Sequence, residues 1–136
     1  MAYWLVKSEP NTWSWDAHVK AGAADAWTGV RNFQARAHLS NMKKGDKVFF
    51  YHSGDEKAVV GVSEVAREAY PDPTDPTGKF IAVDLKADHP LKRPVTLAEI
   101  KADPAFAQMV LVKSSRLSVQ PVRPDEWKRI SEQGGH

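Results

Sequence analysis

Two apolar runs joined by a short polar turn constrain the fold of this chain more than any other feature. Residues 47–52 read Lys-Val-Phe-Phe-Tyr-His, and residues 58–66 are rich in Val, with Gly54 and charged residues between the two runs. Aromatic and β-branched runs on either side of a Gly-containing turn are typical of an antiparallel β-hairpin. The sequence therefore predicts such a hairpin, and Gly61 in its second strand predicts a bend or a close approach by another backbone.

Further strands and short helices are expected on both sides of this hairpin. Residues 3–6, 79–86 and 117–122 have the aromatic, β-branched or alternating composition of strands. Residues 71–78 contain Pro at three positions and predict a long surface loop. Caps and apolar spacing also predict five helices. The first covers 14–20, capped by Ser14 and ended by Gly22, and the second covers 33–42, with Phe33, Ala37 and Leu39 facing inward. Two short helices are expected between 96 and 109, at the Thr96 and Asp103 caps, and the last runs from Pro124 to the residue before Gly134.

Together these elements predict a single domain over residues 1–136 and the α+β class. Five or six mostly antiparallel strands with several short helices fit a small β-barrel surrounded by helices. A chain of 136 residues is long enough to bury about two thirds of the surface that its unfolded form exposes.

Charge and composition limit the functions open to the chain. Nineteen Lys and Arg against seventeen Asp and Glu give a formal net charge of +2, too small to drive strong non-specific binding to a polyanion. The lack of Cys excludes disulfides, thiolate metal sites and a thiol nucleophile. The apolar run at the N-terminus is far shorter than a signal or membrane-spanning segment, so the sequence predicts a cytoplasmic protein without membrane contact.

Residues 27–36, Trp-Thr-Gly-Val-Arg-Asn-Phe-Gln-Ala-Arg, combine the groups needed to hold a flat polar ring. Trp27 offers a stacking face, the Asn32 amide both donates and accepts hydrogen bonds, and Gly29 lets backbone approach a ligand closely. The alternative is that Trp27 anchors the core, Gly29 forms a turn, and Arg31 and Arg36 are solvated. Composition alone leaves both interpretations open.

Several polar residues at predicted strand ends are further candidates. Lys7 and Ser8 end the first strand, where they line a ligand site or form an ordinary polar exit. Tyr51, His52 and Ser53 face a ligand or form a turn with a structural His. His52 and Ser53 are adjacent on a strand and point to opposite faces, so they do not form a catalytic pair.

Residues 114–118 place hydroxyls around Arg116 and suit a phosphate or ring-edge contact, the alternative being a polar turn. Elsewhere, the five His have no helical metal-pair spacing. The chain also has no nucleophile elbow, phosphate-binding Gly-rich loop or dinucleotide fingerprint. The sequence therefore predicts no metal site, no cofactor and no enzymatic activity.

Strings over almost the whole chain resemble the EVE domain family. They are YWLVKSEP at 3–10, WTGVRNFQAR at 27–36, GD at 45–46 with FYHS at 50–53, YPDP at 70–73, PVTL at 94–97 and SRLSVQPV at 115–122. The resemblance implies a PUA-like fold related to YTH domains, which read methylated adenine in RNA. It also implies a non-catalytic reader of modified bases in DNA or RNA, cytosine derivatives among them.

The resemblance also implies a role for each candidate residue. Family patterns often carry a Trp near the start of the fourth strand, where this chain has Lys79 and Phe80. Carried over by position, Trp27 is the wall on which the base stacks; Lys7 and Ser8 line the mouth; Val30, Arg31 and Asn32 form the floor and edge; Tyr51, His52 and Ser53 form the opposite side; and Arg116 and Ser118 contact the polar edge or a phosphate.

The resulting hypothesis is a monomeric, non-enzymatic module whose partner is DNA or RNA with a methylated or hydroxymethylated cytosine or a methylated adenine. The first alternative is a sensor that binds a free nucleobase, nucleoside or metabolite in the same pocket. The second is an enzyme acting on a modified base, with His52 or Lys7 as acid or base.

Overall fold

The computed structural model describes residues 2–11, 13–21, 25–114 and 116–135. In chain order the elements are β1 (Tyr3–Ser8), α1 (Trp15–Lys20), β2 (Asp25–Trp27), α2 (Phe33–Asn41), β3 (Lys47–His52), β4 (Ala58–Pro71), β5 (Ile81–Thr96), α3 (Leu97–Ala102), the 3₁₀ turn η1 (Pro104–Phe106), α4 (Val110–Lys113), β6 (Val119–Val122) and α5 (Pro124–Gln133).

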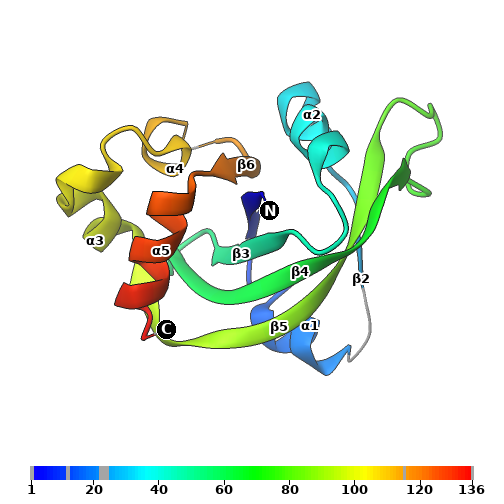
Figure 1. Cartoon of the computed structure of the whole chain (residues 1–136). Coiled ribbons are helices and arrows are strands. Elements are labelled where there is room, and N and C mark those ends of the chain that lie inside the picture. Colours follow the sequence, from blue (N-terminus) through cyan, green and yellow to red (C-terminus); the bar gives the residue numbers. More distant parts are fainter. Residues whose placement is uncertain (1, 12, 22–24, 115, 136) are drawn as a thin grey trace.

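Six strands form one curled sheet in the order β2-β5-β4-β3-β1-β6 (Figure 1). Neighbouring strands are antiparallel except β1 and β3, which run parallel from Tyr3 beside Lys47 to Ser8 beside His52. A parallel pair needs a long crossover, and here α1, β2 and α2 lie between the two strands in the chain. The predicted α+β class and mostly antiparallel sheet are confirmed, and the sheet takes the form of a half-barrel.

The predicted hairpin is present as β3 and β4, and its strands carry register irregularities on both sides of the turn. The strand register shifts between Phe50 and Tyr51 and between Val59 and Gly61. A Cβ atom at Gly61 would lie 2.6 Å from ring carbons of Trp15. The expected bend at Gly61 is confirmed, but the close neighbour is an indole ring rather than another backbone.

Two apolar clusters form on the two sides of the curled sheet. One contains Phe49 and Tyr51 of β3 with residues of α3, α4 and α5, and the other contains Val48 of β3 with Leu39 of α2. In Figure 1, α3, α4 and α5 gather at one end of the sheet and α2 lies at the other, beside the tip of β4 and β5. The fully buried Phe50 packs edge-on against Trp15 and Trp27.

The predicted helices lie where the sequence placed them, but the buried face of α2 differs from the prediction. The Ser14 side chain caps α1 through the Ala17 N–H as predicted, whereas Gly22, its predicted end, lies outside the described residues. In α2 the expectation that Phe33 and Ala37 face inward is wrong, because Ala35 and Leu39 take the buried face and Phe33 is 61% exposed.

Two strands, β4 and β5, extend beyond the residues predicted from the sequence. β4 continues to Pro71 and β5 to Thr96, so the expected loop at 71–78 begins inside a strand and contains the buried Asp72. The Thr96 and Asp103 caps are confirmed at α3 and η1, and a final helix begins at Pro124. The short elements β2 and α4 were not predicted. Within the described ranges, no helix combines the length and apolar character needed to cross a bilayer.

Gly61→Ala is expected to lower the free energy of unfolding by about 1–3 kcal/mol, because its methyl group overlaps the Trp15 indole. Urea denaturation at neutral pH measures the loss. The same substitution in a Trp15→Leu background removes the clashing ring and should cost much less. An equal loss in both backgrounds would show that the close approach of Trp15 is not what requires glycine at this position.

Candidate functional site

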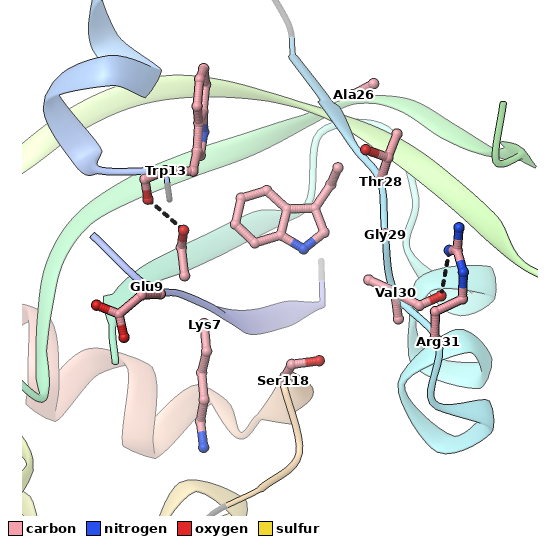
Figure 2. Close-up of a pocket in the computed structure, with 11 residues that line it drawn as sticks. Lys7, Glu9, Trp13, Ala26, Thr28, Gly29, Val30, Arg31 and Ser118 are labelled. Carbon is pink, nitrogen blue, oxygen red and sulfur yellow. Dashed lines mark hydrogen bonds between the residues drawn. The ribbon is translucent and has the colours of Figure 1, made fainter. Parts of the chain in front are cut away.

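A cavity of about 560 Å³ lies where β1 ends, β2 ends and the chain approaches β6 (Figure 2). Three separate segments supply its walls: the exit of β1 with the turn before α1, the end of β2 with the loop to α2, and Ser118. The lining residues are Lys7, Ser8, Glu9, Trp13, Ala26, Trp27, Thr28, Gly29, Val30, Arg31 and Ser118.

Two indole rings, Trp27 and Trp13, supply the aromatic surface of the cavity. Trp27 ends β2 opposite Val83 of β5, and its ring meets Phe50 edge-on with centroids 5.7 Å apart and planes at 86°. Strand pairing with β5 and the contact with buried Phe50 both position Trp27. The turn after β1 holds Trp13, whose backbone N–H donates to the Glu9 carbonyl over 2.9 Å and whose carbonyl accepts from the Ser8 hydroxyl.

The carboxylate of Asp72 holds the wall segment after Trp27 in place. One oxygen accepts from the Gly29 N–H at 2.9 Å and from the Arg31 guanidinium at 3.0 Å, and the other accepts from the backbone and hydroxyl of Thr74, both at 2.7 Å. Gly29 has φ +82°, which an L side chain rarely adopts, so glycine allows this turn. The loops 28–31 and 72–74 are thus joined at one buried side chain.

The ionisation of Asp72 follows from these contacts. Burial on its own raises the pKa of a carboxyl group, but here hydrogen bonds from Thr74, Gly29 and Arg31 outweigh it and lower the pKa of Asp72 to about 2. The carboxylate therefore stays charged at neutral pH, and the Arg31 guanidinium is committed to it and to the Thr74 hydroxyl at 3.0 Å.

Lys7 brings a second cation to the cavity. Its backbone N–H donates to the Ser118 carbonyl over 2.9 Å, and its ammonium group lies 5.7 Å from the centroid of the Tyr51 ring. Burial lowers the pKa of Lys7 below its ordinary value. Glu9 lines the same side of the cavity, with its carboxylate against Gly54 in the turn between β3 and β4.

Six of the eleven candidate residues come together here, and five do not line the cavity. Asn32 caps α2 through the Ala35 N–H at 2.9 Å. Tyr51 is buried in the core beneath Lys7, and Ser53 donates its backbone N–H to the Ser8 carbonyl. His52 and Arg116 are the other two. A ligand contact at any of the eleven positions stays a prediction.

Both ring nitrogens of His52 are engaged within the protein. Nε2 accepts from the Trp15 backbone N–H at 2.9 Å, so Nδ1 carries the proton and donates to Glu56 at 2.5 Å. The side chain is buried and ties the start of α1 to the end of β3. This is the structural His that the sequence left open as an alternative. Arg116 is exposed near the turn before β6.

Sequence reasoning missed Glu9, Trp13, Ala26 and Thr28 as lining residues. Glu9 directly follows Lys7 and Ser8 at a strand exit, and Thr28 directly follows Trp27, so extending each candidate pair by one residue finds both. Trp13 precedes the Ser14 cap, where an apolar residue usually packs against its own helix. In the described part of the chain, no three His, Asp or Glu side chains are grouped to hold a metal ion.

The EVE domain profile matches residues 2–133. The chain belongs to the EVE domain family. Among solved structures it resembles Rpa0253 from Rhodopseudomonas palustris, with 59% sequence identity, a TM-score of 0.93, and coverage of 99% of this chain and 94% of that one.

A second similar structure carries a ligand. Human THYN1, solved in complex with 5-methylcytosine-containing DNA, is 31% identical with a TM-score of 0.90, over 100% of this chain and 99% of that one. The YTH domain of Zygosaccharomyces rouxii MRB1, solved with N6-methyladenosine RNA, is 20% identical with a TM-score of 0.61, over 99% of this chain and 85% of that one. The latter likeness concerns the fold alone.

Asp72→Asn is expected to lower the free energy of unfolding at neutral pH by about 1–3 kcal/mol, because the Gly29 and Arg31 donors lose a charged acceptor. The wild-type carboxylate has its pKa depressed from 3.8 to about 2, so its contribution is present above pH 3.8 and is lost as the pH falls toward 2. Urea denaturation of both proteins across this range measures the difference.

The matched control is Asp55→Asn, which removes an exposed carboxylate in the turn between β3 and β4, away from the cavity, and should leave the free energy of unfolding nearly unchanged. If the gap between Asp72→Asn and the wild type were the same at neutral and acidic pH, the proposed charge-based joining of the two loops would be wrong.

Proposed function

We propose that this EVE domain is a non-catalytic reader that takes a modified nucleobase of DNA or RNA into the cavity walled by Trp27. The observation that carries the proposal is the pairing of two indole rings with a mixed polar edge in one cavity at the ends of β1 and β2. The complex of human THYN1 with 5-methylcytosine-containing DNA supports a cytosine derivative as the first ligand to test.

The chemistry of the walls suits a flat heterocycle. A cavity of about 560 Å³ is within the usual size range of ligand pockets and accommodates a single base with its sugar. An extruded base stacked on an aromatic side chain gains about 1–3 kcal/mol, which offsets part of the cost of leaving the duplex stack. The hydroxyl groups of Thr28 and Ser118 also line the cavity, and a hydroxyl both donates to and accepts from the polar edge of a base, which orients it.

The small net charge supports recognition through the cavity rather than through a broad basic surface. The net charge is only +2 over 136 residues, and Arg31, which lines the cavity, is already bonded to Asp72. Binding to unmodified strands should therefore be weak and should depend only slightly on salt concentration.

The arrangement of His52 supports a binding role over the enzymatic alternative. A general acid or base must reach the substrate proton directly or through one water. His52 uses both ring nitrogens within the protein and does not line the cavity. Lys7 does line the cavity, so the enzymatic alternative is tested by incubating the wild type with modified nucleosides. The proposal predicts that none of them is converted.

Trp27→Ala is expected to weaken binding of a 5-methylcytosine oligonucleotide by about 5- to 100-fold, since it removes the stacking surface. Trp27→Phe should show a smaller loss. Fluorescence anisotropy against matched plain, 5-methyl, 5-hydroxymethyl and N6-methyl oligonucleotides of DNA and RNA measures these affinities and identifies the preferred base.

The control is Trp127→Phe, which alters an indole stacked on Phe49 in the other apolar cluster, away from the cavity. It should bind like the wild type. Equal binding by Trp27→Ala and the wild type would contradict the proposal. Binding of a free modified nucleoside without preference for strands would instead favour the small-molecule sensor.

A further inference from the structure

Next to the cavity, two stacked aromatic rings lie between two guanidinium groups. The Arg31 guanidinium lies 5.4 Å from the Phe80 ring centroid, the Phe80 and Phe33 rings stack with centroids 5.1 Å apart, and the Arg36 guanidinium lies 5.8 Å from the Phe33 centroid. We call these four residues the cation–aromatic ladder. It joins the start of α2 to the segment just before β5.

The exposure of the ladder is unusual for its composition. Phe33 is 61% exposed, and the other large apolar side chain left exposed among the described residues is Val19. Ala35 and Leu39 fill the buried face of α2, so Phe33 does not support the core beneath that helix. Phe33 is not isolated, because it stacks on Phe80 and the two rings are rimmed by guanidinium groups, and an exposed apolar patch with a polar rim is typical of an interaction site.

The ladder is continuous with the cavity. Arg31 lines the cavity and also lies over Phe80, and its hydrogen bonds to Asp72 and Thr74 hold it in that position. Figure 1 shows α2 and the tip of β4 and β5 together at one end of the sheet. A nucleic-acid strand with one base in the cavity would bring its neighbouring nucleotide to the ladder.

Charge complements the rings. Asp72 neutralises Arg31, but Arg36 has no carboxylate partner in the part of the chain that the structure describes. Lys79 is exposed directly before Phe80. The nearby carboxylate of Asp75 is turned to Thr77 and to the Phe80 backbone. Exposed rings flanked by available cations suit bases joined by phosphates better than they suit an apolar or basic partner.

We propose that the cation–aromatic ladder binds the nucleotide next to the one whose base enters the cavity. The adjacent base stacks on Phe33, and Arg36 contacts its phosphate. This inference rests on the proposed function and extends it: the module would read a modified base within a strand, and a free modified nucleoside would lack part of the binding site.

The test compares a short single-stranded DNA carrying 5-methylcytosine with the same strand carrying abasic residues beside the modified base, and with free 5-methyl-2′-deoxycytidine. Phe33→Leu keeps an apolar side chain but removes the ring. It should weaken binding of the intact strand about 5- to 10-fold and leave nucleoside binding unchanged. Phe33→Trp keeps an aromatic ring at this position and should bind the intact strand as the wild type does.

The abasic strand should bind the wild type more weakly by a similar factor, and Phe33→Leu should add no further loss. Arg36→Gln should reduce the slope of log affinity against log salt by about one. Lys128→Gln removes an exposed charge on α5, at the far end of the sheet from α2, and serves as the matched control. Thermal denaturation confirms that all variants are folded.

Strand binding by Phe33→Leu equal to that of the wild type, or equal losses for strand and nucleoside, would overturn the ladder while leaving the cavity as the base site. Failure of the wild type to bind any modified strand or nucleoside would overturn the proposed function and the ladder together.

Discussion

The carboxylate of Asp72 is where two loops 43 positions apart in the chain meet. It accepts hydrogen bonds from Gly29, Arg31 and Thr74 with no exposed side-chain surface, and those bonds keep it ionised. Together with the hydrogen bond from Arg31 to Thr74, this contact holds the segment after Trp27 against the tip of β4 and β5. The shape of the cavity, and the placing of Arg31 over Phe80, both depend on it.

The sheet supplies the other half of the site. Because β1 and β3 run parallel, the exit of β1 lies beside the end of β3, where Ser8 accepts from the Ser53 N–H. Antiparallel β6 brings Ser118 to the backbone of Lys7. Buried Phe50 contacts the Trp27 ring edge-on. Polar residues from the strand ends and an indole from β2 therefore meet at one place.

Features that depend on interactions between residues close in the chain could be predicted from the sequence. Ser14, Thr96 and Asp103 cap their helices because a short polar side chain reaches a backbone N–H two or three residues away. The hairpin of β3 and β4 follows from its turn in the same way. The prediction that Phe33 faces inward was wrong because it rested on the apolar character of the residue, whereas Ala35 and Leu39 form the buried face of α2.

Features fixed by distant contacts could not be predicted in this way. Nothing near Asp72 in the chain indicates that its partners are Gly29 and Arg31, and nothing near Gly61 indicates the Trp15 ring. The resemblance to the EVE family drew attention to Trp27 and Lys7, which line the cavity, but equally to His52, whose two nitrogens hold α1 and Glu56. Family patterns place residues near a site without stating which of them face it.

The central claim is that a modified base enters the cavity beside Trp27, and an NMR titration tests it most directly. Uniformly ¹⁵N-labelled protein is titrated with single-stranded DNA carrying one 5-methylcytosine, with the unmodified strand as reference. The account predicts modification-dependent shifts of the Trp27 and Trp13 indole N–H signals and of the Lys7 and Gly29 amides, with α5 unaffected. Shifts centred on another surface, or identical shifts with the unmodified strand, would contradict it.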